Sequence, residues 1–251
     1  MTDQLREKLA DAGRVLAIEG HGDYVAGHIS VRLSGDPGRF LMKPAGIGIE
    51  EMRPDNIITV DIEGKKIDGA MPRHNEVYIH SEVLRARSDV ACVIHSHPMH
   101  AVAFSSLGRP LVAVGNSGVY FSDGRLPVFS ETTDLIISQE RGRAVARCLG
   151  GNAALILRNH GIVATGGSIE EAVWTAIKLE RACQLQLLAE SAGGPKLLAE
   201  GEDLGKKRQR GNRADQHNNT FSYLVRKWRC LCCGEIVPAP QVTAFENKDQ
   251  R

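Results

Sequence analysis

Three histidines have the side-chain type and the spacing of a metal site. His95 and His97 are separated by one residue at the end of an apolar segment that Pro98 closes. Side chains alternate along a β-strand, so both imidazoles are expected on the same face of a sheet. His160 lies in a turn between two further apolar segments, where Gly161 is expected to let the backbone bend tightly. Three imidazoles with an open fourth position are the usual ligand set of a catalytic divalent metal.

A carboxylate is expected beside this site. Glu76 falls at the start of the helix predicted for residues 75–87, which precedes the histidine segment, so it could reach a metal or a metal-bound substrate. An acidic residue in a first helical turn is also favoured by the helix dipole alone, and the sequence leaves both interpretations open. Imidazole ligands suit zinc, manganese, iron and cobalt alike, so the metal is not specified.

Alternating and helical hydrophobic patterns predict the elements that position these residues. Ser168 followed by Glu171 fits a capping box for the last helix. Strand clusters flanked by helix clusters indicate an α/β fold with a mostly antiparallel central sheet covered by helices. The predicted helices cover residues 4–19, 75–87, 100–106, 132–149 and 168–190, and the strands residues 28–33, 40–43, 56–61, 66–68, 90–97, 153–157 and 161–164.

Composition narrows the class of partner and the compartment. The 251 residues carry 31 Lys+Arg and 30 Asp+Glu, a formal net charge of +1, which gives no indication of nucleic acid or a membrane surface as a partner. No apolar run approaches the roughly 20 residues of a membrane span, and no signal peptide is recognisable, so we expect a soluble, cytoplasmic protein without structural disulfides. The basic run at residues 206–210 is predicted to be a solvated helix face or loop.

The cysteine-rich end of the chain could in principle bind zinc. A structural zinc site usually needs four regularly spaced ligands, whereas Cys230, Cys232 and Cys233 have no second cysteine pair or following histidine. We therefore predict an exposed, disordered tail there, as a flexible C-terminal extension over residues 226–251 that follows a catalytic domain over residues 1–225.

The order Glu76, His95-x-His97 and Asn159-His160-Gly161 resembles the metal motif of the class II aldolase/adducin family, typified by bacterial fuculose-1-phosphate aldolase and ribulose-5-phosphate 4-epimerase. The resemblance extends from about residue 5 to residue 190. It implies a three-layer fold, with a sheet sandwiched by helices, and a homotetramer with sites at subunit interfaces. It also implies one divalent ion per subunit (Zn, Mn, Fe or Co) on the three histidines, with Glu76 as ligand and acid/base.

The substrate pocket departs from the sugar-phosphate members of that family. They cradle the phosphate with Gly-Asn, Thr-Gly and Ser-Ser pairs, and the matching positions in this chain are Gly27-His28, Ala45-Gly46 and His74-Asn75. Most of the hydroxyl donors are therefore missing. Arg73, His74 and His28 are cationic or potentially cationic groups that suit a carboxylate. The departures favour a resemblance to the decarboxylase branch, which includes 3-hydroxy-2-methylpyridine-4,5-dicarboxylate 4-decarboxylase and the dihydroxyphthalate decarboxylases.

The resulting hypothesis is a divalent-metal-dependent carbon–carbon lyase of aromatic compound catabolism. It would decarboxylate a small hydroxylated aromatic or heteroaromatic (di)carboxylic acid through a metal-stabilised enolate. The alternatives are an aldolase or epimerase of a sugar-like hydroxy-carbonyl compound and, more remotely, a non-catalytic adducin-like interaction module. Weaker site candidates are Tyr120, which matches a region where the aldolases supply a tyrosine from the neighbouring subunit, and His217 and Tyr223, in a stretch that closes over the site in some members.

Overall fold

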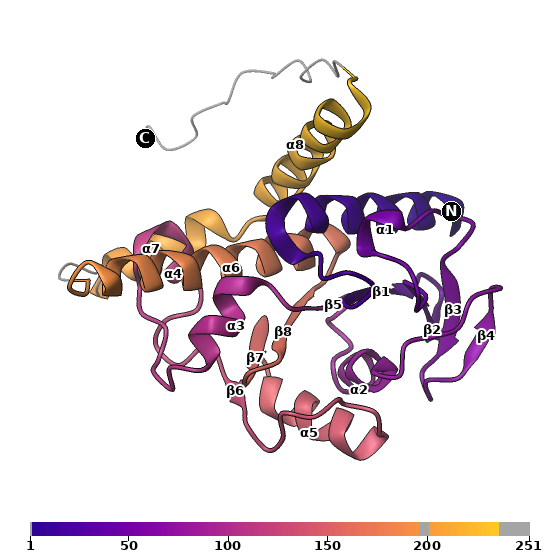
Figure 1. The fold of residues 1–251 in the computed structure, drawn as a ribbon, viewed down its shortest axis with the longest axis horizontal. Coiled ribbons are helices and arrows are strands. Elements are labelled where there is room, and N and C mark those ends of the chain that lie inside the picture. The colour runs from indigo at the N-terminus through magenta and orange to yellow at the C-terminus, as the bar shows by residue number, and fades with distance from the viewer. Residues whose placement is uncertain (1, 196–200, 236–251) are drawn as a thin grey trace.

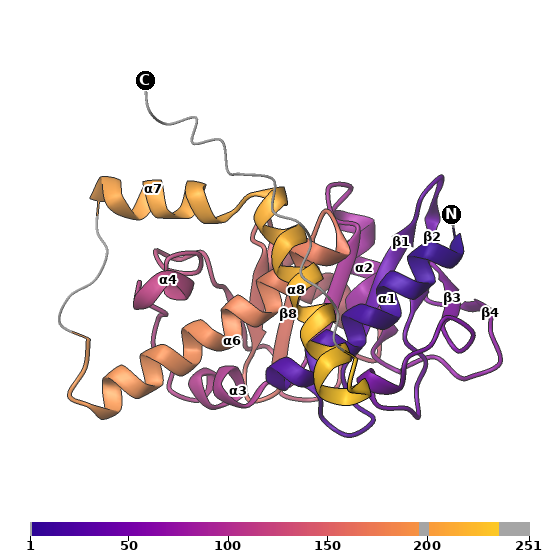
Figure 2. The same ribbon diagram turned by 90° about the horizontal axis from the view of Figure 1, so that it is seen from above.

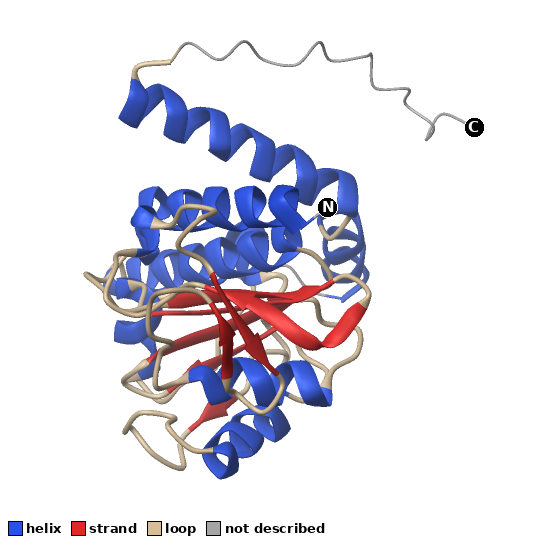
Figure 3. Cartoon of the chain, turned by 90° about the vertical axis from the view of Figure 1, so that its right-hand side faces the viewer, coloured by secondary structure: helices blue, strands red, loops and turns tan. Residues whose placement is uncertain are grey.

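An eight-stranded sheet lies between two layers of helices in the computed structural model, which describes residues 2–195 and 201–235 (Figures 1 and 3). The strand order is β4-β3-β2-β1-β5-β8-β7-β6, and every neighbouring pair is antiparallel except β6 with β7. This confirms the predicted α/β fold with a mostly antiparallel sheet. The strands are β1 (His28–Leu33), β2 (Asp36–Met42), β3 (Ile58–Asp61), β4 (Lys66–Asp68), β5 (Cys92–Ser96), β6 (Val128–Phe129), β7 (Ala154–Leu157) and β8 (Gly161–Gly166).

The helices divide between the two faces of the sheet (Figures 1 and 3). One face is covered by α1 (Thr2–Leu16), α3 (Met99–Ser105), α6 (Ile169–Ser191) and α8 (Ala214–Cys233). Figure 2 looks onto the face that carries α1, α6 and α8. The other face is covered by α2 (Val77–Ala86) and α5 (Gln139–Leu149). The remaining helices are α4 (Gly115–Gly118) and α7 (Gly201–Gly211), and α4 packs on α6. Two short helical segments, η1 (Ala17–His21) and η2 (Ile49–Glu51), complete the structure of the described residues.

Alternation along β5 decides which face the metal-site histidines occupy. Cys92 and Ile94 belong to the core shared with α1 and α6, whereas Val93 belongs to the core shared with α2 and α5. His95, two residues after Val93, therefore points to the α2 side. His28 is the register partner of His95 on β1, so it points to the same side. Two strands thus direct imidazoles toward the start of α2.

The helix predicted for residues 132–149 begins seven residues later than expected. Ser138 caps α5, and its Oγ accepts the backbone N–H of Arg141 at 3.3 Å. Before the cap, the backbone N–H of Ile136 donates to Oε1 of Glu76 at 2.9 Å instead of entering a helix. The contact with Glu76 competes with helical hydrogen bonding, and residues 132–137 consequently form a loop at the site.

The capping box predicted for α6 is half confirmed. Oγ of Ser168 accepts the backbone N–H of Glu171 at 3.1 Å, as expected. The carboxylate of Glu171, however, accepts the backbone N–H of Gly167 at 2.8 Å, one residue before the cap. Both contacts satisfy donors near the first turn, where no intrahelical partner exists.

The disordered tail predicted at the cysteine-rich end is wrong for its first part. Helix α8 continues to Cys233, so the expected boundary at residue 225 falls inside a helix. Cys230, Cys232 and Cys233 are exposed free thiols near its end, and residues 236–251 of the predicted extension lie outside the described residues. The basic run at residues 206–210 lies on α7. Across residues 2–195 and 201–235, every helix is too short or too polar to cross a bilayer.

Candidate metal centre

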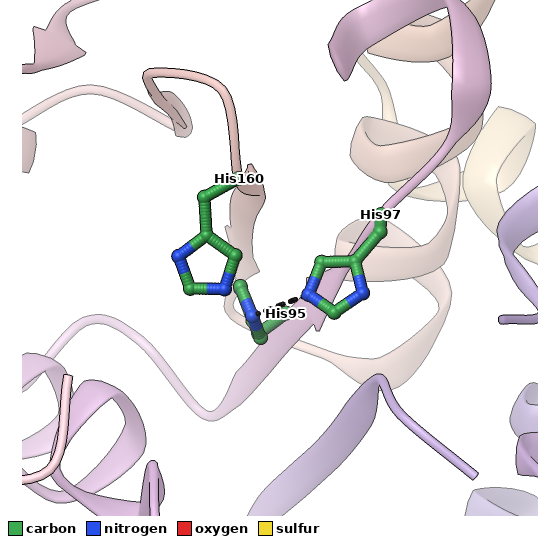
Figure 4. Close-up of side chains that lie close together, drawn as sticks. All are labelled: His95, His97 and His160. Carbon is green, nitrogen blue, oxygen red and sulfur yellow. Dashed lines mark hydrogen bonds between the residues drawn. The ribbon is translucent and has the colours of Figure 1, made fainter. Parts of the chain in front are cut away.

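The imidazoles of His95, His97 and His160 meet at one end of the sheet (Figure 4). His95 lies in β5, His97 follows the last residue of that strand, and His160 lies in the turn between β7 and β8. One ring nitrogen from each residue falls within 4.8 Å of the others. The structure therefore brings together the three residues that the sequence singled out as metal ligands.

The hydrogen bonds of His95 and His97 leave two lone pairs facing each other. Nδ1 of His95 donates to the carbonyl oxygen of Ile162 at 2.9 Å, and Nδ1 of His97 donates to Oδ2 of Asp23 at 2.9 Å. A neutral imidazole that donates from Nδ1 has an unprotonated Nε2. The two Nε2 atoms are 3.0 Å apart. Zinc–nitrogen bonds of tetrahedral geometry would separate them by about 3.3 Å, so a cation between them fits this donor set.

The protonation state of these rings also suits a metal. Burial lowers the pKa of His160 to about 4, with His95 as the next contribution. Burial and the neighbouring His95 lower the pKa of His97 as well. Metals bind the neutral imidazole, so metal binding near pH 7 would require no proton release from these two rings.

Glu76 directs its carboxylate at the same point. Its Oε2 lies 3.6 Å from Nε2 of His95, and its Oε1 lies 3.7 Å from Nε2 of His160. Burial alone would raise the pKa of Glu76, but contacts with His28 and His95 outweigh it and hold the pKa well below its usual range. Glu76 is therefore an anion at neutral pH, and it sits beside the imidazoles rather than only in the field of the helix.

The turn that carries His160 differs in detail from the expectation. The left-handed backbone conformation belongs to Asn159, with φ of +54°, and Gly161 has no positive φ. Gly161 is needed for a close approach instead, because a Cβ there would lie 2.5 Å from the carbonyl oxygen of Ser96 and 2.6 Å from Cδ2 of His97. The glycine thus lets β8 pack against the end of β5, which sets the distance between the histidines.

An open cavity of about 710 Å³ adjoins the imidazoles, and His97 and His160 form part of its wall. Its rim includes Met99, which is 76% exposed, and Leu135, which is 47% exposed. Asp134 and Asn159 add polar groups. A cavity with an apolar rim and polar groups near the candidate ligands suits a small, flat and partly polar molecule.

The predicted substrate contacts are not among the residues that line this cavity. His28 is buried, with its Nε2 3.9 Å from Oε2 of Glu76, and its ring centroid is 4.5 Å from that of His74. Nη1 of Arg73 donates to the carbonyl oxygen of His74 at 2.9 Å. The N–H of Ala45 donates to the carbonyl oxygen of Pro72 at 2.9 Å, which brings residues 45–46 beside residues 73–75. Gly46 and Asn75 are exposed.

The expected positive charge of His28 and His74 is not found. Burial lowers the pKa of His28 well below its ordinary value. Burial and the neighbouring Lys43 lower the pKa of His74 to about 4. Both rings are therefore neutral near pH 7, because the desolvation free energy of a buried imidazolium exceeds the stabilisation that the neighbouring groups provide.

Lys43 is the functional candidate that the sequence analysis missed. Its side chain is fully buried, its Nζ donates to the carbonyl oxygens of Val25 at 3.0 Å and Pro44 at 3.3 Å, and it lies 3.2 Å from Nε2 of His74. Burial lowers its pKa to about 8. The available signal was a lysine directly after the apolar segment Phe40-Leu41-Met42, where a buried strand end is expected.

The weaker candidates gather elsewhere. The ring centroid of Tyr120 is 4.7 Å from that of Trp174 on α6, and the centroid of His217 on α8 is 4.8 Å from the same ring. Tyr223 is 55% exposed on α8. Within one chain, Tyr120 and His217 therefore lie on either side of Trp174 in an aromatic cluster that is separate from the histidine centre.

The chain is similar to known proteins in sequence and in fold. The chain is 34% identical over 213 residues to 3,4-dihydroxyphthalate decarboxylase from Terrabacter sp. (strain DBF63). The aligned residues cover 79% of this chain and 87% of the relative. The chain is 32% identical over 194 residues to the meiotically up-regulated gene 14 protein of Schizosaccharomyces pombe, which covers 73% and 72%. L-fuculose 1-phosphate aldolase from Glaciozyma antarctica PI12 superposes with a TM-score of 0.81 at 29% identity, over 93% of this chain and 91% of that one.

The chain spans 62% to 87% of the length of five curated relatives at 32% to 34% identity. Relatives and structural neighbours named decarboxylases and aldolases are carbon–carbon lyases, and the predicted enzyme class is thereby confirmed. The domain described as "Class II Aldolase and Adducin N-terminal domain" matches residues 7–187. The chain therefore belongs to the class II aldolase and adducin family.

Proposed function

We propose that this chain is a divalent-metal-dependent decarboxylase of a hydroxylated aromatic or heteroaromatic carboxylic acid. The observation that carries the proposal is the convergence of three imidazoles and the Glu76 carboxylate, together with a buried ammonium group, Lys43, next to positions that lack hydroxyl donors. A sugar phosphate needs several small donors, whereas a carboxylate needs a positive potential and a few N–H groups. The similarity to the Terrabacter decarboxylase supports the same choice.

His95, His97 and His160 would hold the cation, with Glu76 as a further ligand or as the neighbouring base. When bound, the cation supplies Lewis-acid stabilisation of the negative charge that departing carbon dioxide leaves on the substrate. The identity of the metal is left to measurement, because imidazole and carboxylate ligands suit several divalent ions.

The chain's own residues would bind and orient the substrate. Lys43 raises the local potential for an anion, and Arg73 is the proposed carboxylate partner, since its guanidinium has the planar fork that fits a carboxylate. His28 lies beside Glu76 and beside His74, which contacts Lys43. Met99 and Leu135 line the cavity. An aromatic ring would rest on the apolar rim while its acidic groups face the interior.

Of the two alternatives, only the first has a specific observation in its favour. An aldolase or epimerase of a sugar-like compound is favoured by the similarity to L-fuculose 1-phosphate aldolase. A non-catalytic adducin-like module would have no need for three converging imidazoles and an ionised carboxylate, which are all present. The predicted homotetramer with sites at subunit interfaces and the predicted cytoplasmic location stay predictions.

The test is a mass-spectrometric screen of the purified protein loaded with zinc, manganese, iron or cobalt. Hydroxy ring acids and ketose phosphates are offered separately, and carbon dioxide and aldehyde are measured. We expect carbon dioxide from a ring acid. Arg73→Ala should abolish that release, while Arg53→Ala, which removes an exposed arginine paired with Asp55, should retain it. Cleavage of a ketose phosphate with no decarboxylation would overturn the proposal.

A further inference from the structure

We infer that His80 and Ser30 are positioning residues that hold His28 as an N–H donor at Nε2, facing Glu76 and the substrate. The role toward substrate rests on the function proposed above, whereas the hydrogen-bond arrangement is testable without it. Neither His80 nor Ser30 was singled out by the sequence analysis. Both are fully buried, His80 on α2 and Ser30 on β1.

The three side chains form a continuous hydrogen-bonded chain that ends at the metal centre. Oγ of Ser30 is 2.7 Å from Nδ1 of His80, and Nε2 of His80 is 2.6 Å from Nδ1 of His28. The other nitrogen of His28, Nε2, lies 3.9 Å from Oε2 of Glu76. Alternation along β1 places Ser30 and His28 on the same face, so one ring of α2 can span them.

Only two proton arrangements satisfy this chain when both rings are neutral. In the first, Ser30 donates to Nδ1 of His80, Nε2–H of His80 donates to Nδ1 of His28, and His28 carries its proton on Nε2. In the second, every donor and acceptor is reversed, and Nε2 of His28 has an exposed lone pair. The hydroxyl of Ser30 serves either arrangement equally well, so it does not decide between them.

Glu76 decides between the two arrangements. Its Oε2 faces Nε2 of His28 at 3.9 Å, and a carboxylate oxygen attracts an N–H at that nitrogen and repels a lone pair there. The 2.6 Å contact between Nε2 of His80 and Nδ1 of His28 holds a single proton between the two nitrogens, so a proton on Nε2 of His28 requires that His80 be the donor in that contact. The first arrangement therefore prevails.

The arrangement explains why a histidine replaces a small amide at this position of the pocket. A neutral imidazole with Nδ1 occupied offers one N–H in one direction, and its ring cannot turn without breaking the 2.6 Å contact to His80. Such a fixed donor can stabilise negative charge that develops on a substrate oxygen, without the cost of holding a buried cation. His80 and Ser30 act through His28 and touch no substrate themselves.

The proton positions can be measured by nitrogen-15 NMR of protein labelled at its nine histidines. His28 and His80 signals are assigned by their loss in His28→Gln and His80→Gln. We expect both rings to carry the proton on Nε2 and to have an unprotonated Nδ1. Protons on Nδ1 of both rings would overturn the inference, whatever the activity of the enzyme.

Kinetics test the positioning role. His80→Phe fills the volume but removes the donor to His28, and we expect kcat to fall about tenfold or more with little change in KM. His80→Gln retains an amide N–H and should recover part of kcat. Equal losses in both variants would contradict positioning. If His80→Phe does not fold, the serine pair below carries the test.

Ser30→Ala and Ser81→Ala form a matched pair. Both serines are fully buried, but Oγ of Ser81 has no hydrogen-bond partner among the described residues, whereas Oγ of Ser30 contacts His80. Ser30→Ala should shift the Nδ1 signal of His80 and lower kcat, and Ser81→Ala should change neither. Unshifted His80 signals in Ser30→Ala would reject the proposed hydrogen bonds from Ser30 through His80 to His28. Protons on Nε2 of His28 and His80 without any decarboxylation would reject the proposed function but support the proposed hydrogen bonds.

Discussion

Oδ2 of Asp23 accepts a hydrogen bond from Nδ1 of His97 at 2.9 Å, which ties the loop before β1 to the metal centre. This carboxylate fixes the His97 tautomer that leaves Nε2 free for a metal, as the carbonyl oxygen of Ile162 does for His95. Carboxylates and carbonyls behind ligating histidines orient the rings and raise their basicity. Asp23 is thus expected to strengthen metal binding through His97 without being a ligand itself.

Asp23→Ala should weaken metal binding about 10- to 100-fold, the usual cost of losing such a partner. Isothermal titration of the metal-free protein with zinc or manganese measures the dissociation constant. Asp55→Ala, at an exposed aspartate paired with Arg53, is the control and should bind metal like the wild type. An unchanged dissociation constant in Asp23→Ala would mean that His97 is not a ligand or is oriented by other groups.

Gly161→Ala should destabilise the protein by about 1–3 kcal/mol and weaken metal binding, because its Cβ would collide with the backbone of Ser96 and with the ring of His97. Gly151→Ala is the matched control, since a Cβ there meets no atom within 4 Å. Urea unfolding gives the free-energy difference. Equal stability of the two variants would show that β5 and β8 tolerate a wider separation.

Lys43→Met should raise KM for an anionic substrate about tenfold or more, because it removes the buried ammonium beside His74. Lys66→Met provides the comparison, since Nζ of Lys66 also donates to two backbone carbonyls, those of Gly69 and Met71. Both variants lose loop contacts, but only the first loses charge near the site. Steady-state kinetics with the ring acid distinguish them, and equal KM values would remove Lys43 from the binding site.

Acid should destabilise the metal-free protein between about pH 6.5 and pH 4. Burial lowers the pKa of His21 to about 4, opposed by the nearby Glu19, so the unfolded chain binds a proton in this range and the folded chain does not. Stability is therefore complete above the unfolded pKa and is lost as the pH falls, by about 1.4 kcal/mol per pH unit for this residue. Denaturant unfolding at pH 7 and pH 5 measures the loss, which His21→Gln should reduce. An identical slope in His21→Gln would contradict the assignment.

Local patterns predicted much of the frame. Periods of two and 3.6 located the strands that carry His28 and His95, the two strands on either side of His160, and the helix that follows Glu76, because these elements have one face in a core. The helix predicted for residues 132–149 was too long because the N–H of Ile136 bonds to Glu76, sixty residues earlier in the chain. Helix α8 was missed because its few buried residues, His217, Phe221 and Leu224, leave a weak apolar pattern.

The amino-acid sequence was enough to identify the candidate metal ligands, their order and the family to which they point. Side-chain chemistry and short-range spacing are sufficient for that. Only the tertiary structure decided the charges, since burial makes His28 and His74 neutral and places the ammonium of Lys43 where the sequence suggested imidazolium. It also decided which nitrogen faces the centre, because Asp23, Ile162 and His80 are distant in sequence from the rings they orient. Protonation and tautomer depend on neighbours in space, and the fold alone supplies them.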